Sequence, residues 1–224
     1  MEQQLQRLQA IKGRMVAAAK NAGRNPEDVT LVTVSKNFDA ADIIPLLQKG
    51  HRVFGENRVQ EAIAKWPSMT AKFPGVELHL IGPLQSNKTA EAVGFFDAIQ
   101  TVDREKIALA ISIEAKKQNR DIQIYVQVNT GDEPQKAGVK LESASLLIAK
   151  CQELFGTKLR GLMCIPPIGE DPRPHFDKLR ELANQNGLTG LSMGMSSDYE
   201  IAIEAGATLI RVGSAIFGAR LTKP

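Results

Sequence analysis

Short apolar runs alternate with longer amphipathic stretches along almost the whole chain. A run of about four to eight apolar or β-branched residues is typical of a buried strand, whereas apolar residues spaced three and four apart predict a helix with one buried face. The first 20 residues have the helical spacing and predict an N-terminal helix. The apolar runs that follow predict eight strands, at residues 29–36, 52–57, 77–82, 98–103, 122–129, 159–166, 188–194 and 208–213.

Each predicted strand is followed by a segment with helical spacing. Strict alternation of strand and helix predicts a parallel sheet, because a crossover must return the chain to the same end of the sheet. Eight such units favour closure into one (β/α)8, or TIM, barrel, with residues 1–224 as a single α/β domain that carries an extra N-terminal helix. An open, doubly wound sheet is the alternative. The predicted helices are residues 40–50, a segment that ends near 66, then 87–93, 104–118, 141–155, 174–185, 197–206 and 214–220.

The predicted strand at residues 122–129 alternates apolar and polar side chains. Alternate positions of a strand face opposite sides, so one set would pack outward on helices and the other would point into the barrel. A barrel without a ligand usually fills its interior with branched apolar residues, so a polar set predicts a ligand near the barrel mouth. The outward set is Ile122, Ile124, Val126 and Val128, and the inward set is Gln123, Tyr125, Gln127 and Asn129.

Charge and hydropathy exclude several classes of function. The net charge is only +3, and basic residues alternate with acidic ones, so we expect no nucleic-acid partner. No apolar run approaches the roughly 18 residues that would span a bilayer, and the N-terminus lacks the apolar core of a secretion signal. These features predict a soluble, cytoplasmic protein without a membrane partner.

The cysteines and histidines do not suggest a metal site. Cys151 and Cys164 lie in a predicted helix and a predicted strand, where we expect them to be reduced packing residues. The three histidines are not spaced as metal ligands are. We therefore expect no bound metal.

In a barrel of this kind, functional sites form at the carboxyl ends of the strands. Lys36 ends the first predicted strand and shares the parity of Val32 and Val34, so its side chain should project into the barrel. One interpretation is a lysine at the barrel rim or an ion-pair partner of Glu56. The other is a Schiff-base lysine, whose amine condenses with an aldehyde when its pKa is lowered by apolar surroundings and nearby cations.

The last two predicted strands lead into segments suited to phosphate. Gly213 allows close backbone approach, Ser214 opens a helix with free N–H groups, and Ser196 adds a hydroxyl. Loops after these two strands commonly form a phosphate site in (β/α)8 barrels. Ser197 or Asp198 would then cap the following helix, a role that is compatible with phosphate binding nearby.

Arg211 lies two residues before Gly213 on the same face of its strand, so it should also point inward. A guanidinium inside a barrel needs an acceptor, because an unpaired buried charge is costly. Asp198 or Glu200 is a candidate structural partner. A ligand nitrogen or a phosphate is the alternative.

At these positions the chain resembles the pyridoxal phosphate homeostasis proteins (the YggS/PROSC type), which are themselves similar to the barrel domain of alanine racemase. The resemblance runs in order from the first strand nearly to the C-terminus. It rests on the segments VTVSK, FGENRVQEA, HLIGPLQSNK, GLMCIP, LSMGMSSDYEIAIEAG and TLIRVGSAIFGAR.

The resemblance implies a binding site for pyridoxal 5′-phosphate (PLP). It implies that Lys36 holds PLP as a Schiff base and that Arg211 faces the pyridine nitrogen. Many relatives have threonine where this chain has Ser214, and the hydroxyl is retained. The remaining implied contacts are Ser196, Gly213 and Ser214 on the phosphate with Ser192 close by, Asn57 near the ring, and His79 and Met163 in the pocket wall.

The resemblance also implies a function in intracellular PLP (vitamin B6) homeostasis without robust catalysis. An arginine beside the ring nitrogen makes PLP a weaker electron sink than a carboxylate would. The sequence ends four residues after the last motif, so we expect no second domain of the racemase type, an open pocket and a monomer. PLP-dependent apo-enzymes and amino or keto acids are further candidate partners. A PLP-dependent amino-acid racemase that uses Lys36 and a Schiff-base aldolase on a sugar phosphate are the alternative functions.

Overall fold

The computed structural model describes residues 2–218, in which eight parallel strands close into a barrel. Neighbours along the chain pair with one another, and the last barrel strand pairs with the first, so the ring is complete. The structure thereby confirms the predicted (β/α)8 fold and excludes the open sheet. The barrel strands are β1 (Thr30–Val34), β2 (Val53–Glu56), β3 (Glu77–Leu80), β4 (Ala98–Val102), β5 (Gln123–Asn129), β7 (Leu159–Cys164), β8 (Gly190–Ser192) and β9 (Leu209–Val212).

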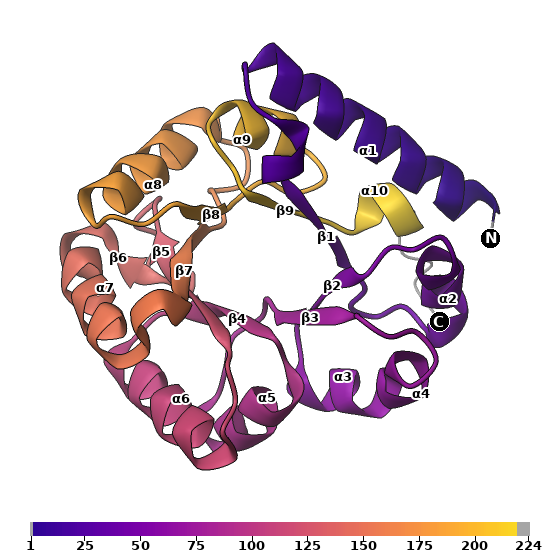
Figure 1. The fold of residues 1–224 in the computed structure, drawn as a ribbon. Helices are drawn as coiled ribbons and strands as arrows, with labels where there is room; N and C mark the ends of the chain where they lie inside the picture. The colour runs from indigo at the N-terminus through magenta and orange to yellow at the C-terminus, as the bar shows by residue number, and fades with distance from the viewer. Residues whose placement is uncertain (1, 219–224) are drawn as a thin grey trace.

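Helices surround the barrel on its outside (Figure 1). The N-terminal helix α1 (Glu2–Asn21) packs along α9 (Tyr199–Glu204) and α10 (Ser214–Phe217), so the first and last helices of the described chain are neighbours. The other helices are α2 (Ala40–Gln48), α3 (Val59–Lys65), α4 (Pro67–Thr70), α5 (Thr89–Phe95), α6 (Glu105–Gln118), α7 (Leu141–Phe155) and α8 (Arg173–Gln185).

Most predicted elements lie within a few residues of the observed ones, and the differences have local causes. Strand β1 ends at Val34, so Lys36 lies in the turn that follows it. The helix expected to end near residue 66 is divided at Trp66, because Pro67 cannot donate a backbone hydrogen bond and begins α4 instead. A two-residue strand, β6 (Val139–Lys140), was not predicted. Residues 219–220 of the last predicted helix lie outside the described residues.

The apolar residues form two packing layers. The outer layer fills the space between strands and helices and contains the predicted outward set of β5, including Ile124 and Val126. The smaller inner cluster lies on the barrel axis and consists of Val32, Tyr125, Met163 and Leu209, with Val53 packed against it. Polar side chains share this interior with the cluster, because Arg211 is level with Val32 and Ser192 is level with Met163 on the paired strands.

Both cysteines are buried and free of disulfide bonds. Burial raises the pKa of each thiol to about 12, which leaves both as protonated packing groups. None of the helices within residues 2–218 is long and apolar enough to cross a membrane.

Candidate functional site

A cavity of about 440 Å³ opens at the carboxyl ends of the barrel strands. The segments after β1, β2, β3, β7, β8 and β9 all contribute to its wall. Six of the nine predicted site residues line it: Lys36, Asn57, Ser196, Arg211, Gly213 and Ser214.

Lys36 lies half-buried in the turn between β1 and α2. The amide of Ser35 donates to the carbonyl of Gly55 on the neighbouring strand (3.0 Å), and the amide of Phe38 closes the turn by donating to the carbonyl of Ser35 (3.1 Å). Asn37 adopts a left-handed conformation with φ of 64°, which its short polar side chain tolerates better than most. The turn therefore places the Lys36 side chain on the cavity wall.

A buried charged cluster supports this turn from below. Glu56 is fully buried, and its Oε1 accepts hydrogen bonds from Ser35 Oγ (2.6 Å) and Trp66 Nε1 (3.0 Å). The same oxygen lies 2.7 Å from Lys65 Nζ, and Lys65 also donates to the carbonyl of Ser35 (2.8 Å). Glu56 is thus neutralised by Lys65, a partner that the sequence analysis did not identify.

Two serines and a helix start meet in the part of the cavity wall that follows β8 and β9. Ser214 Oγ donates to Ser196 Oγ (3.1 Å), and the amide of Ala215 donates to the same oxygen (3.3 Å). A Cβ atom at Gly213 would lie 3.0 Å from the carbonyl oxygen of Val34, so a larger residue would crowd the first strand. Asp198 lies at the start of α9, where its Oδ1 accepts from the amide of Met195 (2.6 Å) rather than from a helix amide.

Arg211 reaches into the barrel from β9 and is only 4% exposed. Its Nη1 donates to Ser192 Oγ (2.7 Å) and its Nη2 to the carbonyl of Cys164 (2.8 Å). Among the described residues, no carboxylate lies within ion-pair distance of it, and Glu200 pairs with Arg14 on the surface. Burial lowers the pKa of the guanidinium, yet arginine stays charged in proteins, so the cavity floor holds a cation.

The other three predicted site residues lie deeper in the barrel. Ser192 is fully buried beneath Arg211, and Met163 belongs to the inner apolar cluster. His79 lines a second cavity, at the amino-terminal ends of the strands. His79 is level with Ala98, the first residue of β4, because the strands are staggered around the barrel.

Apolar residues complete the cavity and were not predicted. Ile81 and Ile165 follow β3 and β7 directly, and Phe38 stacks on Phe217 with ring centroids 4.3 Å apart. Ile165 was within reach of sequence reasoning, because it lies next to the end of the strand predicted at residues 159–166. The residues present fit PLP: a lysine amine for the aldehyde, hydroxyls and amides for the phosphate, and apolar walls for the ring. The lining residues include two cations and no carboxylate, which suits an anionic ligand.

Comparisons with known proteins agree with this architecture. Residues 6–221 match the family model of the alanine racemase N-terminal domain, which defines the class of barrel. The chain is 38% identical over 222 residues to the pyridoxal phosphate homeostasis protein of Escherichia coli K12, covering 95% of each. The chain belongs to the family of pyridoxal phosphate homeostasis proteins.

Solved structures give the same result for the fold. The PLP-bound structure of PipY from Synechococcus elongatus PCC7942 is 38% identical, with a TM-score of 0.79 over 93% of this chain and 100% of PipY. An alanine racemase of Clostridium difficile 630 is 14% identical with a TM-score of 0.75, and the match covers all of this chain but 58% of the racemase. The likeness to the racemase concerns the fold alone.

Proposed function

We propose that this chain binds PLP in the cavity at the carboxyl ends of the strands and serves intracellular PLP (vitamin B6) homeostasis rather than robust catalysis. The observation that carries the proposal is that Lys36 and Arg211 line the same cavity, and that its lining residues include no carboxylate. The names of the relatives and the PLP bound to PipY agree with it. PLP supplies an aldehyde that reacts with amines and a ring that accepts electrons.

Each lining group has a separate role in this proposal. Lys36 would hold PLP covalently through its amine, because the cofactor supplies an aldehyde that reacts with amines with loss of one water. Ser196, Ser214 and the backbone amides after Gly213 bind the phosphate, because free N–H groups and hydroxyls at a helix start favour an anion. Asn57 and the apolar walls border the ring.

Arg211 limits the chemistry that the site supports. A cation beside the ring nitrogen disfavours its protonation, and an unprotonated pyridine withdraws electrons from a bound amino acid only weakly. Ser192 Oγ and the Cys164 carbonyl hold the guanidinium in place, so this cation is a fixed part of the site. Racemase-like turnover is the alternative function, and the fold likeness is its sole support here.

The first experiment is an absorption spectrum of the purified protein before and after borohydride, followed by mass spectrometry of the Lys36 peptide. We expect a visible band that disappears on reduction and leaves a pyridoxyl group on Lys36. Lys36→Ala should lose this borohydride-stable attachment and keep a weaker, phosphate-anchored affinity. Lys49→Ala, at an exposed lysine outside the cavity, is the matched control and should behave as the wild type.

Two outcomes would contradict the proposal. A colourless protein that takes up no added PLP would refute cofactor binding, and a sugar-phosphate aldolase would then be the leading idea. Stoichiometric turnover of an amino acid would establish an enzyme instead. A monomeric, cytoplasmic state and exchange of PLP with apo-enzymes stay predictions from the sequence.

A further inference from the structure

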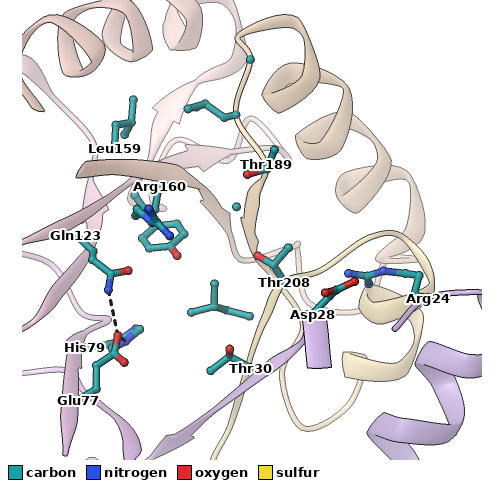
Figure 2. Close-up of a pocket in the computed structure, with 15 residues that line it drawn as sticks. Arg24, Asp28, Thr30, Glu77, His79, Gln123, Leu159, Arg160, Thr189 and Thr208 are labelled. Carbon is teal, nitrogen blue, oxygen red and sulfur yellow. Dashed lines mark hydrogen bonds and ion pairs between the residues drawn. The ribbon is translucent and has the colours of Figure 1, made fainter. Parts of the chain in front are cut away.

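The second cavity, of about 680 Å³, lies at the opposite end of the barrel from the proposed PLP site. Its wall is built from residues at the starts of strands, among them Thr30 of β1, Glu77 of β3, Gln123 of β5 and Arg160 of β7. Figure 2 shows Glu77 and Gln123 on one side of this space and Arg24 with Asp28 on the other.

Charges of both signs face this cavity. Glu77 Oε1 accepts hydrogen bonds from His79 Nε2 (2.9 Å) and Gln123 Nε2 (3.4 Å), whereas its Oε2 has no hydrogen-bond partner among the described residues. The hydrogen bond from His79 lowers the pKa of Glu77, so the side chain is a carboxylate at neutral pH. Arg160 is exposed, and its side chain makes no ion pair or hydrogen bond with another described residue.

The two charges act on the same part of the cavity. Burial raises the pKa of Tyr125 to about 12, while Arg160 lowers that pKa and Glu77 raises it. The phenol therefore stays protonated, and Arg160 and Glu77 line the same cavity as Tyr125. A simple anion would be repelled by Glu77 and Asp28, and a simple cation by Arg24 and Arg160. A ligand with one charge of each sign meets both demands.

A chain of hydrogen bonds joins the two cavities through the barrel interior. Arg211 donates to Ser192 Oγ, and Ser192 donates to Gln100 Oε1 (2.6 Å). Gln100 Nε2 then donates to His79 Nδ1 (2.6 Å), and His79 Nε2 donates to Glu77. The direction is fixed by its ends, because arginine can only donate and a carboxylate can only accept. The chain therefore connects Glu77 to Ser192, one of the groups that position Arg211.

We propose that the cavity at the amino-terminal ends of the strands binds a small zwitterion, with its ammonium group on Glu77 and its carboxylate on Arg160, and that the hydrogen-bonded chain transmits this binding to Arg211. Gln100 and His79 are positioning residues in this proposal. The ligand site stands independently of PLP, whereas the transmission rests on the proposed function.

Ligand binding is tested by calorimetry on protein freed of PLP. Glycine and 4-aminobutyrate are the zwitterionic probes, and butyrate and butylamine carry one charge each. We expect 4-aminobutyrate to bind and the single-charge probes to bind at least about tenfold more weakly, as the loss of one charge-assisted hydrogen bond implies. Glu77→Gln and Arg160→Ala should each weaken binding by a similar factor. Failure of both zwitterions to bind, or equal binding of butyrate or butylamine, would overturn the ligand site.

Transmission is tested on protein whose cofactor has been fixed to Lys36 by borohydride. The pyridoxyl group is then inert toward amines and fluorescent, so it reports on its surroundings without reacting with the probe. Mass spectrometry of the Lys36 peptide beforehand separates failure of the proposed function from failure of this inference. We expect the zwitterion that binds to change the fluorescence of the wild type.

Gln100→Met should retain binding by calorimetry and lose the fluorescence response, because methionine fills the space but cannot continue the hydrogen bonds. Thr101→Val, at the next residue of β4, removes a buried hydroxyl that donates to the Gly82 carbonyl outside this chain, and should keep the response. Gln100→Leu, which also ends the hydrogen bonds and does not touch the cavity lining, replaces Gln100→Met if the latter loses its folded circular dichroism spectrum. Binding that leaves the wild-type fluorescence unchanged, or a response that survives in these variants, would overturn the transmission.

Discussion

The two ends of the barrel are made by the same strands, yet they present different chemistry. The carboxyl end lines its cavity with Lys36 and Arg211 and includes no carboxylate among its described lining residues. The amino end combines Arg24 and Arg160 with Asp28 and Glu77. An excess of positive charge favours an anion such as a phosphate ester, whereas balanced charges favour a neutral or zwitterionic molecule. The difference teaches that the two ends of one set of strands can carry unlike charge, because different residues of each strand face the two cavities.

The largest expected effect, on stability, comes from removing the buried ion pair between Lys65 and Glu56 beneath the carboxyl-end cavity. Lys65→Met leaves the carboxylate of Glu56 buried without its cation, so the free energy of unfolding should fall by about 3–5 kcal/mol. Urea denaturation measures this loss. Lys49→Met, at an exposed position, is the control. A loss no larger than that of the control would mean that Glu56 does not depend on Lys65.

A pH-dependent effect of similar size is expected from His51, which precedes β2 at the amino end. Burial lowers the pKa of His51 to about 4 from its ordinary value of 6.5. Between pH 4 and pH 6.5, His51 is therefore protonated in the unfolded chain and neutral in the folded chain. The stabilisation is present above pH 6.5 and is lost as the pH falls toward 4, by up to about 3 kcal/mol. Urea denaturation across this range should give a shallower pH dependence for His51→Gln, and parallel curves would contradict the assignment.

A smaller effect, on ligand affinity, is expected from Arg211→Glu. Reversing this buried charge should raise the dissociation constant for PLP at least about tenfold and change the visible spectrum. Arg211→Lys keeps the positive charge but lacks the planar guanidinium. Its dissociation constant for PLP should lie between those of the wild type and Arg211→Glu. Absorption titration of the folded variants gives both quantities. An unchanged spectrum in Arg211→Glu would argue against contact with the ring nitrogen.

The smallest effect is expected from Arg160→Ala at the amino end. Because Arg160 is exposed and has no partner among the described residues, stability should change by no more than about 0.5 kcal/mol. The affinity for PLP without other ligand should stay within about twofold, since the chain to Arg211 ends at Glu77. A marked loss of PLP affinity in this variant would remove the distinction between the two ends.

The fold was predictable because alternation is a strong signal. Helix α7 has the predicted bounds, and the outward set of β5 packs in the outer layer. The carboxyl-end residues Lys36, Arg211 and Ser214 could be grouped because they follow or end parallel strands, and their roles stay predictions. His79 was expected beside them, but the stagger between β3 and β4 places it at the other end, and stagger has no signature in a single sequence.

The amino-end cavity and the chain of hydrogen bonds could not be predicted in this way. Gln100 lies in the middle of β4, next to Thr101, and nothing in its sequence neighbours reveals that it meets both His79 and Ser192. The contact with Ser192 joins strands far apart in sequence, and the contact with His79 joins the neighbouring strands β3 and β4. Lys65 is similar, because only the packing of α3 against β2 brings it to Glu56.

The pairing of β1 with β9 has a consequence for biosynthesis. Lys36 follows β1, near the beginning of the chain, whereas Ser214 follows β9, near the end, and the two strands are neighbours in the barrel. A chain that is still emerging from the ribosome holds the lysine but lacks the phosphate-binding loop. Until β9 is made, β1 also has an unpaired edge, and such long-range closure is slow. Under the proposed function, the two halves of the cofactor site therefore come together only after β9 has been made.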